Sequence, residues 1–366
     1  LITFVISSLV FLTVFTLIYS FLVLRSSQFP LLNWGNPHNW ENLIRHISGF
    51  QYQVWLFSSS EAAKEQFVYF ITNLPLEFSY ITFIIGLMGF IISFKVSKQN
   101  YIFLLILFFF TVFYAINYDI NDIDSYFLAA YVAFSLLSVF ALVYIYTKLP
   151  INIKNKAALI LFIIPLFQLF FTFNSVNQSD NYIYHDYTNH ILKTTQKNSM
   201  IISYQWDYFI SPFYYFRYVE NKRPDLIVID KELLRRSWYY TQLETNYKGI
   251  FDNLQNDKIE FLKALQPFER KEDYNPQILE KYYRAIIKGL IADNIDKRPI
   301  YFGPELIDNE IKNDQIEIPD GLSLVPEGLL YRVVKNRDYH PQNNYNINIR
   351  FPKTEDKYII NLKNII

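Results

Sequence analysis

The sequence predicts an α-helical polytopic membrane bundle followed by an extracytoplasmic α/β domain. Three observations lead to this prediction. The first half of the chain holds five long apolar segments that contain no Asp, Glu, Lys or Arg. The second half alternates short apolar runs with amphipathic stretches, which is the pattern of α/β units. Aromatic residues make up 19% of the 366 residues, more than an ordinary soluble domain carries.

The five apolar segments are long enough, or nearly so, to span a membrane. Crossing the ~30 Å hydrocarbon core takes roughly 17–25 residues in a helix. A buried helix of a soluble protein can be equally apolar, but five such segments in succession favour a membrane bundle. The predicted spans are Ile2–Leu24, Phe78–Phe94, Tyr101–Tyr118, Tyr126–Tyr146 and Ala157–Phe173.

Basic residues in the short loops predict the orientation of the bundle, because such residues stay on the cytoplasmic side. The loop between the second and third spans and the loop between the fourth and fifth spans both contain lysines, and we place both in the cytoplasm. The loop between the third and fourth spans has aspartates and no Lys or Arg. The lysines are Lys95, Lys98, Lys148, Lys154 and Lys156.

This topology divides the chain into three parts. Residues 1–175 form the transmembrane bundle, with an extracytoplasmic loop at residues 25–77. Residues 176–336 form the extracytoplasmic α/β domain, and residues 337–366 form a tail rich in Asn and Lys. The first residue is Leu1, inside an apolar segment without a basic leader or cleavage site, so we expect a C-terminal fragment and not a signal peptide.

The α/β domain is predicted to begin with a strand, helix, strand crossover. "MIIS" (Met200–Ser203) and "LIVID" (Leu226–Asp230) are expected to be buried strands. Ser211 followed by Pro212 is a typical helix start, and the helix is expected to continue to Lys222. Two strands joined in this way are parallel.

A long helix and two further strands are predicted after the crossover. Asn275 and Pro276 begin the helix "NPQILEKYYRAIIKGLIADN" in the same cap arrangement. The strands are "PIYFG" (Pro299–Gly303) and "EGLLYRVV" (Glu327–Val334).

Composition and missing motifs exclude several kinds of function. The formal net charge is zero and no nucleic-acid motif is present, so we predict no nucleic-acid partner. The chain has no Cys, which excludes disulfides, zinc–thiolate sites and a cysteine nucleophile. The five His lack the spacing of a zinc-hydrolase helix, and no phosphate loop, dinucleotide fingerprint or nucleophile elbow occurs. We predict neither a cofactor nor a metal.

The stretch Asn33–Trp55 is predicted to lie along the membrane surface. Trp40, Ile44 and Ile47 share one face of a short helix, and Trp and Tyr prefer the membrane–water interface. The simpler interpretation is an amphipathic helix that only anchors the chain. The predicted anchors are Trp34, Trp40, Tyr52 and Trp55.

Basic residues in the same stretch suggest a second interpretation, binding of a lipid-linked substrate. Arg45 and His46 are adjacent donors expected near the headgroups, and Arg25 ends the first span. A guanidinium binds phosphate with two hydrogen bonds. We therefore hold Arg45 and His46, with the aromatic residues beside them, as candidate substrate-binding residues.

Three aspartates follow the third span. Asp119, Asp122 and Asp124 do not fit a calcium loop, because Asp124 stands where that loop needs glycine. Clustered carboxylates can bind a cation or act as a general base. They can equally stabilise helix N-termini, and the sequence leaves both interpretations open.

A further candidate site lies in the α/β domain. Trp206 and Asp207 follow the carboxyl end of the first strand, where parallel sheets bind ligands. Arg235 and Arg236 precede Trp238 and can pair with a ligand or with Asp207. In the structural interpretation, Asp207 caps the next helix and Trp206 covers the sheet.

Four stretches together resemble a bacterial membrane family similar to protein O-mannosyltransferases and related to a eukaryotic endoplasmic-reticulum O-mannosyltransferase. The first and third are "NWGNPHNWENLIRHISGFQYQVWLF" and "WDYFISPFYYFRYVENKRPDLIVIDKELLRRSWYY". The second and fourth are "YDINDIDSYFLAAY" and "RPIYFGPEL". They span both halves of the chain. The stretches are Asn33–Phe57, Trp206–Tyr240, Tyr118–Tyr131 and Arg298–Leu306.

The resemblance implies a GT-C type fold in the bacterial inner membrane. It implies transfer of a sugar, mannose above all, from a polyprenyl-phosphate carrier to Ser or Thr of an exported protein. Arg45 and His46 would stabilise the departing phosphate, and Arg25 is a weaker candidate. Such enzymes usually carry their essential acid in the loop after their first span, so we expect the base in an upstream segment, with the three aspartates only as weak candidates.

Two functions of other classes compete with this expectation. A noncatalytic membrane protein could use the α/β domain to bind a glycan or a protein. A transporter would be expected to carry charged residues inside its spans, and the five predicted spans contain none.

Overall fold

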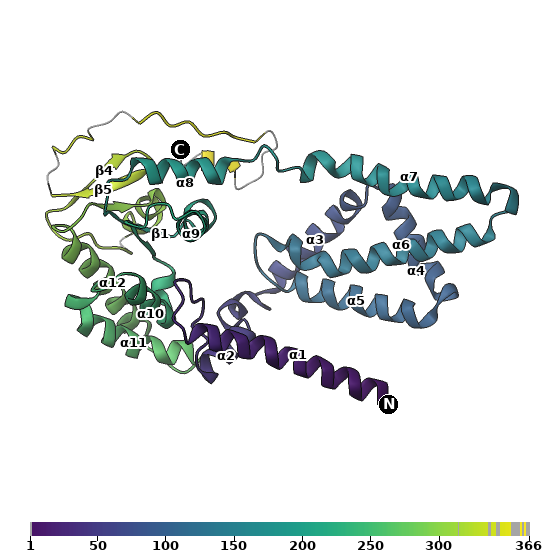
Figure 1. Cartoon of the computed structure of the whole chain (residues 1–366), viewed down its shortest axis with the longest axis horizontal. Helices are drawn as coiled ribbons and strands as arrows, with labels where there is room; N and C mark the ends of the chain where they lie inside the picture. The colour runs from purple at the N-terminus through teal and green to yellow at the C-terminus, as the bar shows by residue number, and fades with distance from the viewer. Residues whose placement is uncertain are drawn as a thin grey trace. The chain divides into compact units, whose positions relative to one another are not determined.

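The computed structural model describes residues 2–313, 315–335, 338–341, 345–352, 359–360 and 362–363. By contact, the chain forms two compact units. The α/β unit joins Leu1–Ile47 to Gln178–Ile366, and the helical unit is Ser48–Asn177 (Figure 1). The first apolar helix therefore belongs to the same compact unit as the second half of the chain.

The helical unit is built from apolar helices that pack through aromatic side chains. Phe70, Phe108 and Phe134 are among its fully or almost fully buried core residues. Gly86 and Gly89 of α4 lie against Phe134 and Leu137 of α6, where the absence of a side chain lets the two helices approach closely. The elements are η1 (Phe50–Trp55), α3 (Ser60–Glu77), α4 (Ile81–Val96), α5 (Lys98–Ile116), η2 (Ile123–Phe127), α6 (Leu128–Lys148) and α7 (Ile151–Val176).

Three helices among the described residues are long and apolar enough to span a membrane: Ile2–Ser26, Lys98–Ile116 and Ile123–Lys148. The predicted span Phe78–Phe94 corresponds mainly to α4. The helices α3 and α4 form a pair bent by 110°, and the pair counts as at most one further span. In α7 the described apolar part, Ile163–Val176, is shorter than a span. The number of five spans and the topology stay predictions.

The α/β unit contains a sheet of five strands in the order β2-β1-β3-β5-β4. β1 pairs in parallel with β2 and with β3, whereas β5 is antiparallel to β3 and β4. The strands are β1 (Met200–Ser203), β2 (Ile227–Asp230), β3 (Ile300–Phe302), β4 (Ser323–Glu327) and β5 (Leu330–Val334).

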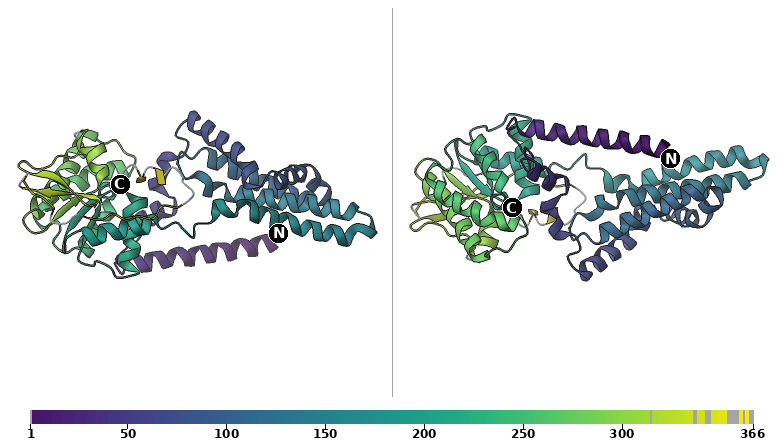
Figure 2. Two further views of the ribbon diagram at one scale, coloured as in Figure 1. Left: turned by 90° about the horizontal axis from the view of Figure 1, so that it is seen from above. Right: turned by 90° about the horizontal axis from the view of Figure 1, so that it is seen from below.

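Helices cover both faces of this sheet (Figure 1). Ile201 and Val228 face a core shared with α8 and α9, whereas Ile202 and Ile229 face a second core shared with α10, α11 and α12. The helix α1 projects from this unit as a single rod (Figure 2). The helices are α1 (Ile2–Ser26), α2 (Trp40–Ile47), α8 (Ile183–Thr194), α9 (Ser211–Tyr218), α10 (Ser237–Asn246), α11 (Gln255–Glu269) and α12 (Pro276–Asn294).

Several sequence predictions for this unit are confirmed. Strands form at Met200–Ser203 and, with one residue less, at Ile227–Asp230, and they are parallel. The predicted long helix is α12, and the Asn275 side chain accepts hydrogen bonds from the amides of Gln277 and Ile278. The apolar patterns and the Asn-Pro cap were therefore reliable guides here.

Two element predictions are wrong. The expected strand Glu327–Val334 is the end of β4, a turn at Gly328 and all of β5, because Gly328 has a positive φ of 65° that reverses the chain. Ser211 is not a helix cap, because a π-helical turn, Trp206–Ile210, runs directly into α9. The same helix ends at Tyr218 and not at Lys222.

The predicted tail is described only in part. Residues 337, 342–344, 353–358, 361 and 364–366 lie outside the described residues. Within the described part, the guanidinium of Arg350 pairs with the Asp186 carboxylate at 2.7 Å. This ion pair fastens the tail to α8 and holds the pKa of Asp186 well below its usual range.

Candidate functional site

The loops that follow the three parallel strands gather at one edge of the sheet, which we call the carboxyl edge. Because β1, β2 and β3 are parallel, their carboxyl ends meet at this edge, and ligands of parallel sheets bind at such edges. The π-helical turn Trp206–Ile210 follows β1, the 3-10 turn Leu233–Arg235 follows β2, and Glu305 comes soon after β3.

A distant part of the chain, residues 33–47, packs against the carboxyl edge, and we call it the docked segment. Trp34 lies with its ring centroid 5.3 Å from that of Trp206 and 5.1 Å from that of Trp238. The backbone N–H of Asn33 donates to the Gln242 side-chain oxygen at 3.0 Å. Aromatic contacts of this kind dominate the energetics of packed surfaces, so Trp34 is the main contact of the docked segment.

Arg45 reaches the same edge through a shared carboxylate. Its guanidinium lies 3.3 Å from Glu269 and 3.1 Å from Glu41. Glu269 also accepts hydrogen bonds from the backbone N–H and the hydroxyl of Ser237, at 3.0 Å and 2.8 Å. Because Ser237 directly follows Arg236, Glu269 brings together two basic clusters that lie far apart in the sequence.

The other basic candidates differ in how they are held. Arg235 pairs with Glu280 at 3.0 Å and stacks over the Tyr283 ring at 3.7 Å. The Arg236 side chain is half-buried, and within the described part of the chain no carboxylate lies within ion-pair distance of it. His46 is also half-buried, with its ring against Gly35. Of Arg45, Arg235 and Arg236, only Arg236 therefore has no carboxylate partner within the described part of the chain.

The remaining aromatic and acidic candidates are divided between the two units. Trp206 is 38% exposed and Trp40 is 75% exposed, whereas Asp207 lies exposed on the turn after β1. Tyr52 belongs to the helical unit, where its ring packs 6.0 Å from that of Trp55.

Buried polar groups beneath the carboxyl edge were missed by the sequence reasoning. The Glu305 carboxylate accepts hydrogen bonds from the Ser203 hydroxyl at 2.7 Å and from the Tyr204 backbone N–H at 2.9 Å. A Cβ on Gly303 would overlap that carboxylate. Burial raises the pKa of Glu305. The signal was present in "GPEL" at the end of the predicted strand Pro299–Gly303, where glycine leaves room for the carboxylate.

Lys231 is the second missed group and is buried just after β2. Its ammonium pairs with Glu310 at 2.9 Å and with Glu232 at 2.6 Å, and it lies 5.0 Å from the centroid of the Tyr204 ring. A buried charge needs such partners to offset its desolvation. These contacts link the loop after β2 to the loop after β3, and so support the shape of the edge.

Asp230 makes the stability of the α/β unit depend on pH. Its carboxylate is buried and accepts hydrogen bonds from the amides of Glu232 and Leu233, yet burial raises its pKa to about 7. The folded state therefore keeps a proton that the unfolded chain releases near pH ~4. The contribution of the Asp230 carboxyl to the stability of the fold is therefore complete below pH ~4. This contribution is lost as the pH rises to about 7.

We expect Asp230→Asn to flatten this dependence, because Asn keeps the acceptor oxygen and cannot ionise. Denaturant unfolding of the detergent-solubilised chain, followed by tryptophan fluorescence, measures the effect. The wild-type free energy of unfolding should fall by on the order of 3 kcal/mol more than that of the variant between about pH 4 and about pH 7. Equal slopes in the two proteins would show that Asp230 does not titrate in this range.

The three aspartates of the acidic loop do not converge on one point. The Ser58 hydroxyl donates to Asp119 at 3.0 Å, and the Tyr69 hydroxyl donates to Asp124 at 2.7 Å. Asp122 precedes η2 without a side-chain cap bond. Within the described residues, no group of three His, Cys, Asp or Glu side chains is arranged to hold a metal ion.

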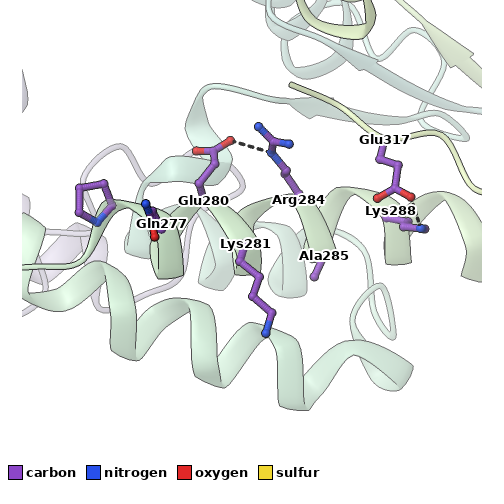
Figure 3. A pocket seen from close by; sticks show the side chains of 8 residues that line it. Gln277, Glu280, Lys281, Arg284, Ala285, Lys288 and Glu317 are labelled. Atoms are coloured by element: carbon purple, nitrogen blue, oxygen red, sulfur yellow. Dashed lines mark hydrogen bonds and ion pairs between the residues drawn. The ribbon is translucent and has the colours of Figure 1, made fainter. Parts of the chain in front are cut away.

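An open groove of about 660 Å³ runs along α12 beside the site (Figure 3). Glu280 in this groove bonds to Arg284 at 3.5 Å and also to Arg235 of the carboxyl edge. Lys288 pairs with Glu317 at 2.5 Å. The groove is lined by Pro276, Gln277, Glu280, Lys281, Arg284, Ala285, Lys288 and Glu317.

Comparison with known proteins gives one distant relationship. The chain is similar to the protein O-mannosyl-transferase tmem260 of Dictyostelium discoideum, with 23% identity over 180 residues. The similar region is 49% of this chain, and the chain covers only 19% of that protein's length. No protein-family model and no solved structure matches the chain. The similarity supports a distant relationship to an O-mannosyltransferase.

Proposed function

We propose that the chain belongs to a membrane glycosyltransferase that moves a sugar, mannose in the first instance, from a polyprenyl-phosphate donor to Ser or Thr hydroxyls of exported proteins. The observation that carries the proposal is the distant similarity to a protein O-mannosyltransferase. Apolar helices long enough to span a membrane fit a lipid-linked donor. A GT-C type architecture and a bacterial inner-membrane location are part of the same proposal.

The carboxyl edge offers groups suited to the donor phosphate. In the transfer, the acceptor oxygen bonds to the anomeric carbon while the bond from that carbon to the phosphate oxygen breaks, and the lipid phosphate leaves with the electron pair. Positive groups held in place stabilise such a leaving group. Arg236, Arg45 and His46 are the candidates, and Arg45 is already oriented by Glu269.

The proton of the acceptor hydroxyl must go to a base, which we do not assign within the described residues. Glu41 is engaged with Arg45 and Arg270, and is therefore a poor candidate. Asp119, Asp122 and Asp124 stay weak candidates, and Asp119 and Asp124 each already accept a hydrogen bond from a protein hydroxyl.

The aromatic groups of the site suit the sugar or the lipid end of the donor. Trp206 is partly exposed. Its ring packs against that of Trp34, and the Trp34 ring packs against that of Trp238. A rigid, amphipathic aromatic surface gives contact area at little entropic cost. The same surface would suit a protein that binds glycans without catalysis, so the test must measure transfer.

The proposal is tested by transfer of radiolabelled mannose from polyprenyl-phosphate-mannose to a Ser/Thr peptide by the full-length protein. We expect transfer by the wild type and about 100-fold lower kcat/KM for Arg45→Ala, because a donor to the leaving phosphate is lost. Arg284→Ala, which removes an exposed guanidinium from the neighbouring groove, is the control and should retain activity. Binding of the donor without transfer would support the glycan-binding alternative. Normal activity of Arg45→Ala would remove Arg45 from the proposed site.

A further inference from the structure

The end of α1 is fixed to the α/β unit by a compact set of hydrogen bonds. The buried Ser26 hydroxyl donates to the Asn36 side chain at 3.1 Å. The Asn33 side-chain amide donates to the Ser26 carbonyl at 3.3 Å and to Asn36 at 2.9 Å. A helix that ends in such a network cannot turn freely at its last residue, so the direction of α1 fixes the orientation of the surface around it.

The length of α1 sets where this surface lies if α1 crosses a bilayer. Its 25 residues correspond to roughly 37 Å of helix, slightly more than the ~30 Å hydrocarbon core. Arg25 in the last turn suits the headgroup level, because long basic side chains extend to the interface from helix ends. The residues immediately after α1 therefore lie at the membrane–water interface.

Apolar side chains are exposed directly beyond the end of α1. Phe29, Leu31 and Leu32 are 55%, 58% and 43% exposed. The Leu31 carbonyl accepts hydrogen bonds from Asn246 at 2.9 Å and from the Tyr218 hydroxyl at 3.4 Å. Leu31 is therefore held against the end of α9, although its side chain faces outward.

The helix α9 continues the same apolar surface. Tyr215 of α9 and Val219, the residue that caps its C-terminus, lie four residues apart on one side of the helix and are 53% and 69% exposed. They flank Tyr218, which contacts Leu31. The neighbouring carboxylate of Glu220 is neutralised by Lys222 at 2.5 Å. We call Phe29, Leu31, Leu32, Tyr215 and Val219 the interfacial patch.

Phe29, Leu31 and Leu32 of the interfacial patch follow closely on Ser26, the last residue of α1, and Leu31 contacts the end of α9. The helix α2 lies beside the end of α1 (Figure 1), and it exposes Trp40 and Ile44 on its outer face. Trp and Tyr prefer the membrane–water interface. Continuity with α1 identifies the occupant of this surface as lipid.

We propose that the interfacial patch is inserted into the surface of the bilayer that α1 crosses, so that the α/β unit rests on the membrane in one orientation. The proposal depends on the membrane placement of α1 in the proposed function. An apolar face of this kind enters the headgroup region by about 5–10 Å. Aromatic rings connect the patch to the carboxyl edge, because Tyr218 packs against Tyr214 and Tyr214 against Trp206. A lipid-linked ligand in the bilayer would then reach the carboxyl edge at the membrane–water interface.

Site-directed spin labelling tests the orientation, since the chain has no native cysteine. The full-length protein, with any cysteine outside this chain replaced by serine, is reconstituted in vesicles with single spin labels at Val219→Cys, at Leu12→Cys in α1, and at Ile259→Cys in α11. Relaxation by oxygen, which partitions into lipid, is compared with relaxation by a water-soluble nickel chelate. Ile259 is 45% exposed and serves as the matched control for an exposed aliphatic side chain outside the patch.

We expect the labels at residues 219 and 12 to relax more with oxygen and the label at residue 259 to relax more with nickel. A label at residue 12 in lipid and one at residue 219 in water would overturn the orientation and leave the membrane placement intact. Labels at both residues in water would overturn the membrane placement as well. Unchanged melting of each labelled protein shows that it is folded.

Discussion

Replacing Trp34 by alanine should lower the free energy of unfolding of the α/β unit by about 3 kcal/mol, because large-to-small changes of packed tryptophan cost about 3–5 kcal/mol and Trp34 is only partly buried. The ring of Trp34 contacts those of Trp206 and Trp238. Without it, the docked segment should separate from the carboxyl edge. Denaturant unfolding in detergent measures the loss, and limited proteolysis after Phe29 or Leu31 should become faster.

Trp40→Ala is the matched control for this experiment. Trp40 is only six residues away but is 75% exposed, and exposed substitutions usually change stability by less than ~0.5 kcal/mol. Equal effects of the two substitutions on stability in detergent would contradict the docking of residues 33–47.

Gly89→Ala should destabilise the helical unit by about 3 kcal/mol, at the upper end of the cost of overpacking. A Cβ at residue 89 would overlap the backbone carbonyl of Leu137 in α6. A backbone carbonyl cannot rotate away as a side chain can, so α4 and α6 must separate. The Ser93 hydroxyl, which also contacts the Leu137 carbonyl at 3.5 Å, should lose its partner. Thermal unfolding followed by helical circular dichroism measures the change.

Two substitutions on the same helix are compared with this result. Gly86→Ala would overlap the ring of Phe134, which is fully buried among other aromatic rings, so it should cause a loss of similar size. Ile91→Ala removes a side chain that is 74% exposed and should change the melting temperature in detergent little. A Gly89→Ala protein that melts like wild type would exclude close packing of α4 on α6 at this point.

Much of the fold was predictable because local patterns determined it. The runs Met200–Ser203 and Ile227–Asp230 are short, apolar and buried on both faces, as strands of a covered parallel sheet should be. Asn275 and Pro276 marked the start of α12 correctly. Failures occurred where a single residue changes the path of the chain. Gly328 divides an apparently continuous strand, and α3, which falls in the predicted loop at residues 25–77, joins α4 at a bend of 110°.

The candidate site was predictable only in part. The sequence singled out Trp206, Arg235 and Arg236 because they follow strands, and separately singled out Arg45. It gave no sign that Glu269 joins them, because that contact spans 224 residues. It also could not distinguish Trp34, which packs on protein, from Trp40, which is exposed. Both fit a membrane-surface helix equally well, and only tertiary contacts separate them.

The carboxyl edge is proposed to hold the phosphate of a lipid-linked sugar, and Arg236→Ala is the most direct probe of this binding. Unlike Arg45, Arg236 has no carboxylate within ion-pair distance in the described part of the chain, so its removal breaks no ion pair there. Arg284 on α12 is the matched control.

Titration of the detergent-solubilised full-length protein with polyprenyl-phosphate-mannose measures the Kd of this binding directly. A charge-assisted hydrogen bond contributes about 1.5–3 kcal/mol, so the Kd should rise by about 10- to 100-fold in Arg236→Ala. The Kd of Arg284→Ala should equal that of the wild type. An unchanged Kd in Arg236→Ala, or no binding by the wild type, would contradict a phosphate site at the carboxyl edge.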